Sequence, residues 1–148
     1  MGKVYKFVKD FKHRYRSTIV FRLKKHSAVI EKNLNPGEEV LYAFPAQKNE
    51  VTSEVFSSCV VVLTNRRIMI GQKRLLWGYF LSSITPDMFN DLTVSTGLIW
   101  ATIQIDTIKE LVVLTNIDKD AASEIQSKIT SFMMEEKKKY AIRENNKE

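Results

Sequence analysis

Residues 57–73, SSCVVVLTNRRIMIGQK, consist of a valine-rich run, a short polar stretch and a second apolar run. β-branched residues favour extended strands, and the pair Thr64-Asn65 between two such runs favours a tight turn. The segment is therefore predicted to be a β-hairpin, with strands at residues 57–63 and 66–73.

Similar short apolar segments lie on both sides of this hairpin. Five further strands are predicted at residues 39–47, 76–84, 91–95, 98–106 and 109–114. The alternation is clearest in residues 98–106, where Ile103 and Ile105 share one face and Trp100 lies on the other. Seven short strands at this spacing predict an antiparallel barrel or sandwich.

After the strands, the sequence predicts one long helix that begins near Asp118. This aspartate is suited to cap the helix, and apolar residues then recur every three or four positions on one face. They are Ala122, Ile125, Ile129, Phe132, Met133 and Tyr140. We expect this face to close the open end of the barrel, and residues 144–148 to fray.

The charge distribution separates the first 32 residues from the rest. They carry ten lysines and arginines against two acidic residues, a net charge of +8, whereas residues 33–148 sum to −2. Helical periodicity is present at residues 3–16, and a second helical stretch ends at Asn35-Pro36-Gly37, which stops a helix. The sequence thus predicts a basic helical leader, residues 1–33, before a body, residues 34–143.

The body resembles the bacterial pleckstrin-homology (PH) family over roughly residues 34–134. The similarity rests on residues 34–40 (LNPGEEV), 62–70 (VLTNRRIMI), 97–100 (GLIW) and 105–108 (IDTI). It implies a PH-like, half-open barrel of seven antiparallel strands, mostly β within the α+β class, that the C-terminal helix plugs at one end. It also implies no enzymatic activity, and some members of the family form rings.

We find no catalytic, cofactor or metal site in the sequence. His13 and His26 have no acidic or cysteine partner nearby, Cys59 lies alone in an apolar run, and no glycine-rich phosphate loop is present. PH domains that bind phosphoinositides use a basic loop between their first two strands. The equivalent residues 48–54 hold one lysine and two glutamates, so neither inositol-lipid binding by the body nor a small-molecule substrate is expected.

The leader is the first candidate binding surface. Its contacts to an anionic membrane or a partner would come from Lys3, Lys6, Lys9, Lys12, Arg14 and Arg16. Its apolar docking face would be Val4, Phe7, Val8, Phe11 and Tyr15. Such a helix suits the surface of an anionic bilayer, but the same apolar face can instead pack against the barrel.

The body offers a second candidate surface. Arg66, Arg67 and the outward-facing Trp100 are interface candidates, although paired arginines at a hairpin also hold neighbouring carboxylates. Trp77, Tyr79 and Phe80 are expected in the core or in an oligomer interface rather than as a platform for nucleic-acid bases.

Together these patterns predict a non-enzymatic adaptor or scaffold that binds protein, above all a second copy of itself. Its leader would dock to a partner or to the inner face of the membrane. No apolar run is long enough to cross a bilayer and no signal peptide is present, so we expect a cytoplasmic protein. The alternative is a small nucleic-acid-binding protein that uses the leader and Arg66-Arg67, against which the net charge of the body argues. The short length and basic leader would also suit a protein of a phage or another mobile element.

Ending the chain at Asn116 is expected to abolish folding, because the helix that plugs the barrel is lost. Each fully buried large side chain contributes roughly 1.5–3 kcal/mol, and several such contributions compare with a net stability of about 5–15 kcal/mol. Soluble expression and a thermal melt test this prediction. A soluble fragment that melts cooperatively would contradict it.

Overall fold

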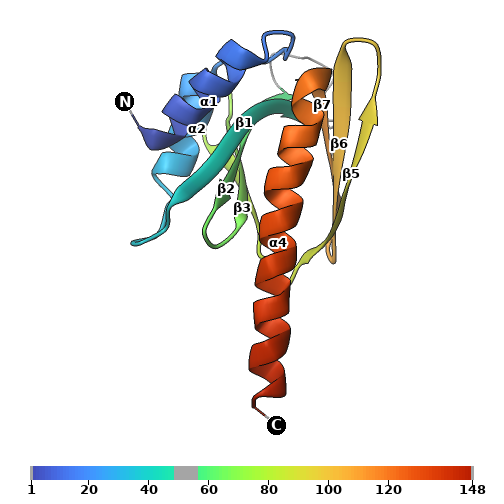
Figure 1. Cartoon of the computed structure of the whole chain (residues 1–148). Coiled ribbons are helices and arrows are strands. Elements are labelled where there is room, and N and C mark those ends of the chain that lie inside the picture. Colours follow the sequence, from blue (N-terminus) through green and yellow to red (C-terminus); the bar gives the residue numbers. More distant parts are fainter. Residues whose placement is uncertain (1, 49–56, 148) are drawn as a thin grey trace.

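The computed structural model describes residues 2–48 and 57–147 (Figure 1). In this part of the chain, seven strands form one antiparallel sheet that curls into a half-open barrel, with the strand order β4-β3-β2-β1-β7-β6-β5. The elements are α1 (Lys3–Arg14), α2 (Leu23–Glu31), β1 (Val40–Lys48), β2 (Ser58–Thr64), β3 (Ile68–Lys73), β4 (Tyr79–Ile84), β5 (Phe89–Thr96), β6 (Trp100–Thr107), β7 (Leu111–Asp118) and α4 (Ala122–Asn145). The predicted barrel with a C-terminal helix is confirmed.

The predicted strand limits are wrong in two places that matter for function. The fourth strand was expected to begin at residue 76, but β4 begins at Tyr79, and residues 74–78 form the exposed tip of the β3–β4 hairpin. Gly78 has a left-handed φ of 77° that ends the extended conformation there. Arg66 and Arg67 were expected within the third strand, but they belong to the β2–β3 turn, since β3 begins at Ile68.

Strands β1, β2 and β3 are buried on both faces. On the inner face, Phe44, Val61 and Ile70 belong to the main core of the barrel. On the outer face, Val62 and Met69 belong to a second cluster that contains residues from α1 and α2. The run of valines in β2 therefore shows no alternation because both of its faces are covered.

The N-terminal helices provide this outer cover. Val4, Val8 and Ile30 are fully buried in the second cluster. Phe11 reaches further, and its ring centroid lies 6.0 Å from that of Phe44 in the main core. Of the two alternatives for the apolar face of the leader, packing against the barrel is thus the one found in the structure.

The segment between α1 and α2 ties the two halves of the sheet together. The amide of Ile19 donates to the carbonyl oxygen of Asn116 (3.0 Å), and its own carbonyl accepts a hydrogen bond from Gln47 Nε2 (2.8 Å). The amide of Phe21 donates to Ser58 Oγ (2.9 Å). These bonds connect β7 to β1 and β2. They lie where the two halves of the sheet meet, since β1 and β7 pair at only two described positions, Gln47↔Thr115 and Lys48↔Leu114.

Helix α4 closes the barrel, as its periodicity predicts. Asp118 Oδ1 accepts a hydrogen bond from the amide of Asp120 (3.0 Å) in the short 3-10 turn before the helix. Ile125, Ile129 and Met133 are fully buried in the main core. Beyond Met133 the helix carries no buried residue and extends past the barrel as far as Asn145 (Figure 1).

Replacing Gly71 by alanine is expected to destabilise the fold by about 1–3 kcal/mol, the usual effect of overpacking a core. A methyl group at Gly71 would lie 2.6 Å from Cγ1 of Ile30, so α2 would have to move away from β3. Chemical denaturation measures the change. Gly97→Ala is the control, since a methyl group there would meet only the carbonyl oxygen of Trp100, at 3.5 Å. Equal stability of the two variants would contradict the prediction.

Candidate interaction surface

The charged side chains of α1 face solvent because its apolar side is packed against the sheet. Lys3, Lys6 and Lys9 are exposed and make no ion pair within residues 2–48 and 57–147. Arg16 is also exposed. A groove of about 640 Å³ on this side is lined mainly by basic side chains. The groove-lining basic residues are Lys6, Lys9, Lys12, His13 and Arg16.

Two of the predicted contact residues have structural partners. Arg14 pairs with Asp10 (3.1 Å) and with Glu124 of α4 (2.9 Å), and Tyr42 donates to the same glutamate (2.7 Å). Burial raises the pKa of Glu124, but the hydrogen bonds from Tyr42 and Arg14 outweigh it and lower the pKa overall. Lys12 Nζ donates to the carbonyl oxygens of Arg16 and Thr18 at the end of α1. Arg14 and Lys12 therefore hold the helix in place.

The residues of the predicted apolar docking face are distributed between core and surface. Val4, Val8 and Phe11 are fully buried within this chain, and Tyr15 is half-buried against the main core. Phe7 is the one exposed member of the five, with 37% of its surface accessible. In this arrangement the leader exposes its cations to solvent and buries most of its apolar side.

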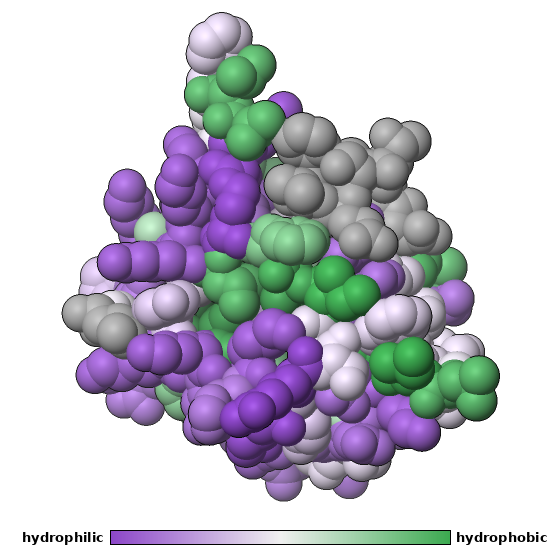
Figure 2. All heavy atoms as spheres, turned by 90° about the horizontal axis from the view of Figure 1, so that it is seen from above, coloured by the Kyte–Doolittle hydropathy of each residue, from purple (hydrophilic) through white to green (hydrophobic). Residues whose placement is uncertain are grey.

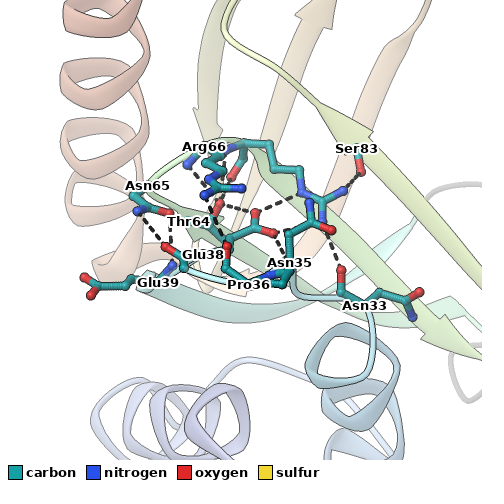
Figure 3. A network of polar contacts seen from close by, with 11 residues as sticks. Asn33, Asn35, Pro36, Glu38, Glu39, Thr64, Asn65, Arg66 and Ser83 are labelled. Atoms are coloured by element: carbon teal, nitrogen blue, oxygen red, sulfur yellow. Dashed lines mark hydrogen bonds and ion pairs between the residues drawn. The ribbon is translucent and has the colours of Figure 1, made fainter.

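Arg67 holds a carboxylate inside the protein, that of Glu38, which is labelled in Figure 3. Its Nε and Nη2 donate to the two oxygens of Glu38, at 2.9 and 3.0 Å. Thr64 Oγ1 donates to the same carboxylate (2.7 Å), and Arg67 Nη1 donates to Ser83 (2.8 Å). Burial raises the pKa of Glu38, but these donors outweigh it and bring the pKa to about 2. The network joins the segments 34–40 and 62–70.

Arg66 has a different position from its neighbour. It is exposed, and its Nη2 donates to the carbonyl oxygen of Pro36 (3.2 Å) (Figure 3). With Tyr140 and Arg143 of α4 it lines a polar hollow of about 420 Å³. The two arginines are adjacent in sequence, but Arg66 is exposed, whereas Arg67 is partly buried by its contacts with Glu38.

Trp100 is attached to the leader. Its Nε1 donates to the carbonyl oxygen of Ser17 (2.7 Å), and 39% of the residue remains exposed. Its neighbours in the β5–β6 turn, Leu98 and Ile99, are exposed to 91% and 48%. Trp100 therefore secures the segment before α2 while its outer edge stays accessible.

The exposed apolar residues on the β3–β4 hairpin were not predicted from the sequence. Of the two positions expected for Trp77 and Tyr79, the core is wrong, because they are exposed to 80% and 53%; the oligomer interface stays a prediction. Leu75 and Leu76 are exposed as well, to 54% and 78%. The signal that could have revealed them is Gly78, which places a turn inside the apolar run.

Among the described residues, no group of three or more histidines, cysteines or acidic residues could hold a metal ion. Cys59 is buried. A hollow between β3, β4 and the start of β7 measures about 110 Å³. The residues at 49–54, in the predicted loop between the first two strands, lie outside the described part of the chain.

Comparisons with known proteins agree with the barrel and its C-terminal helix. The family model described as "Bacterial PH domain" matches residues 34–131. The chain belongs to the bacterial PH domain family. This match begins where α2 and its following turn end, so it leaves out the two helices that cover the outer face of the PH domain. No curated protein matches the sequence.

Among solved structures, the chain is similar to the crystal structure of a pleckstrin homology domain from Shewanella amazonensis SB2B. The sequence identity is 18% and the TM-score is 0.49, with 83% of this chain and 98% of that chain covered. None of the helices described in this PH domain has the length and apolar content that a bilayer-spanning segment requires.

His26 joins α2 to the base of the β3–β4 hairpin. Only 1% of the residue is exposed, and its Nδ1 accepts a hydrogen bond from the amide of Lys73 (2.8 Å). Burial, together with the charge of Arg22, lowers the pKa of this histidine from 6.5 to about 4. The ring is therefore neutral at pH 7, as an acceptor at Nδ1 requires.

Acidification below pH 6.5 is expected to destabilise the protein through His26. The unfolded chain then binds a proton that the folded chain excludes, so the free energy of unfolding falls by about 1.4 kcal/mol per pH unit. The fall continues to about pH 4 and totals about 3 kcal/mol. Glu38 contributes a separate loss at lower pH, because its pKa moves from 4.5 to about 2.

Urea unfolding at pH 7, 6 and 5 measures this effect. His26→Asn keeps an acceptor for the Lys73 amide and removes the titrating group, so its stability is expected to vary less over this range. Parallel pH profiles for the variant and the unmodified protein would show that His26 does not carry the effect.

Proposed function

We propose that this PH domain is a non-enzymatic adaptor that docks peripherally to an anionic membrane surface, at the inner face of the cell membrane. The observation that carries the proposal is the net charge of +8 in residues 1–32, a segment whose two helices have their apolar sides already buried. PH-like domains are generally non-enzymatic binding domains, which is consistent with an adaptor.

The position of the charges supports electrostatic docking. Lys3, Lys6 and Lys9 project from the outer side of α1, and Arg16 lies just beyond its end. Each lysine or arginine near an anionic bilayer contributes about 1 kcal/mol to binding, and the contribution weakens with salt. Four such residues on one rigid support are enough for measurable attachment without any membrane-inserted helix.

A second copy of the chain is the other candidate partner. Strands β4 and β5 end the strand order of the sheet in the described residues, and an edge strand presents backbone groups that another strand can pair with. The exposed Leu98 and Ile99 lie beside the end of β5. A scaffold that self-associates through its sheet edges and docks through its leader would use both surfaces at once.

Co-sedimentation with vesicles tests the docking. The triple variant Lys3→Glu/Lys6→Glu/Lys9→Glu is tested on vesicles in which about one third of the lipid is anionic. It is expected to bind them about 100-fold more weakly, or worse, than the unmodified protein. The control is Lys109→Glu/Lys128→Glu/Lys138→Glu, which removes the same net charge from exposed positions of the body and is expected to retain most of the affinity.

Two results would overturn the proposal. One is equal weakening by the two triple variants, because the effect would then follow net charge alone. The other is no binding to anionic vesicles combined with tight, salt-sensitive binding to duplex DNA, which would assign the cations to nucleic acid. Sedimentation equilibrium of the same samples gives the mass, and hence shows whether copies associate.

A further inference from the structure

The tip of the β3–β4 hairpin carries the largest group of adjacent exposed apolar side chains on the described surface. Leu75, Leu76, Trp77 and Tyr79 are exposed to between 53% and 80%. A single exposed leucine is ordinary on a protein surface, but four large apolar residues within five positions indicate a site of interaction. Figure 2, which looks onto this end of the molecule, shows apolar side chains protruding beside hydrophilic ones.

The hairpin tip is held firmly against α2. The amide of Lys73 donates to His26 Nδ1 (2.8 Å), and Arg22 Nη1 donates to the carbonyl oxygen of Lys73 (3.2 Å). Across the turn, the amide of Arg74 donates to the carbonyl oxygen of Gly78 (3.2 Å). The apolar side chains are therefore presented on a fixed support that the core of the protein positions.

Basic residues surround the hairpin tip. A groove of about 380 Å³ between α2 and the hairpin is lined by Arg22, Lys25, Lys32 and Lys73 together with Leu75 and Tyr79, and no acidic residue is among its lining. Arg74 adds a further cation within the tip. The apolar side chains lie at the end of the hairpin and the cations lie closer to the body of the protein. A bilayer has the matching order, because its phosphates lie at the surface and its apolar layer lies beneath them.

We propose that the hairpin tip inserts Leu75, Leu76 and Trp77 into the apolar layer of an anionic bilayer. Arg22, Lys25, Lys73 and Arg74 then contact lipid phosphates. Tryptophan suits the boundary between headgroups and acyl chains, and long basic side chains reach back to the phosphates. This inference rests on the proposed function and deepens it, because it adds an apolar anchor, resistant to salt, to the electrostatic docking by α1.

The membrane is favoured over a protein partner for two reasons. The tip is a narrow projection, whereas a stable protein interface needs roughly 800 Å² on each partner. In addition, the groove between α2 and the tip is lined by four cations and by no acidic residue of the described part of the chain, which suits the uniform negative charge of an anionic lipid surface better than the mixed charges of a protein.

Vesicle binding by the full chain tests the insertion, in 0.1 M and 0.5 M salt. Leu75→Ser/Leu76→Ser/Trp77→Ser removes only exposed side chains and is expected to weaken binding to anionic vesicles by at least about 10-fold. It should also abolish the binding that persists in 0.5 M salt. Ile108→Ser/Leu111→Ser/Ile142→Ser, at other exposed apolar positions, is the matched control and is expected to bind like the unmodified protein.

Tryptophan fluorescence provides a direct measure of depth. The chain has two tryptophans, so in Trp100→Phe the emission comes from Trp77 alone. Vesicles with brominated acyl chains are expected to quench this emission, and brominated lipids quench only when the ring lies within the bilayer.

The outcomes separate this inference from the proposed function. If the hairpin variant binds normally and Trp77 is not quenched, insertion is wrong, while docking by α1 stands if the Lys3, Lys6 and Lys9 variant still loses affinity. If the unmodified protein binds no anionic vesicle, both are wrong. If the hairpin variant instead changes the mass in sedimentation, the tip contacts a second copy of the chain and insertion is overturned.

Discussion

The burial of strands β1–β3 on both faces is the constraint on which the rest of the structure depends. One face builds the barrel core with α4, and the other needs a cover that the sheet itself does not supply. The apolar sides of α1 and α2 provide that cover, with Gly71 allowing α2 to approach β3 closely. Because these apolar sides are used inside, the basic residues of the same helices must face outwards. The charged surface is thus a result of how the sheet is covered.

Two arginines of this PH domain, Arg14 and Arg67, differ in role from the exposed lysines of α1. Arg67 and Arg14 form ion pairs with Glu38 and Glu124, where a planar guanidinium can bond several acceptors in fixed directions. The cations that remain exposed on α1 are mostly lysines, whose ammonium groups stay hydrated on flexible chains. The two arginines join segments that are distant in sequence, and the lysines of α1 supply positive charge at the surface.

Periodicity was sufficient to predict the seven strands and the long helix, because each has a local pattern of its own. Three features were not local. The partner of Arg67 is a carboxylate 29 positions earlier in the chain, so a pair of arginines could not reveal which of them is engaged. Because both faces of β2 are covered, its residues do not alternate, so Val62 gives no sign that it lies in the cluster beneath α1 and α2. Leu76 and Trp77 continue an apolar run into a turn, and periodicity does not distinguish a projecting apolar residue from a buried one.

The contact between the N-terminal helices and β3 has a consequence for biosynthesis. Helix α1 leaves the ribosome before the strands that bury its Val4 and Val8, and β3 is completed only at Lys73. At about 5–20 residues per second, roughly three to twelve seconds separate the two events. Until then, Met69 of β3 cannot complete the cluster that buries Val4 and Val8. Helix α2, which packs against β3, therefore reaches its native contacts only after β3 has been made.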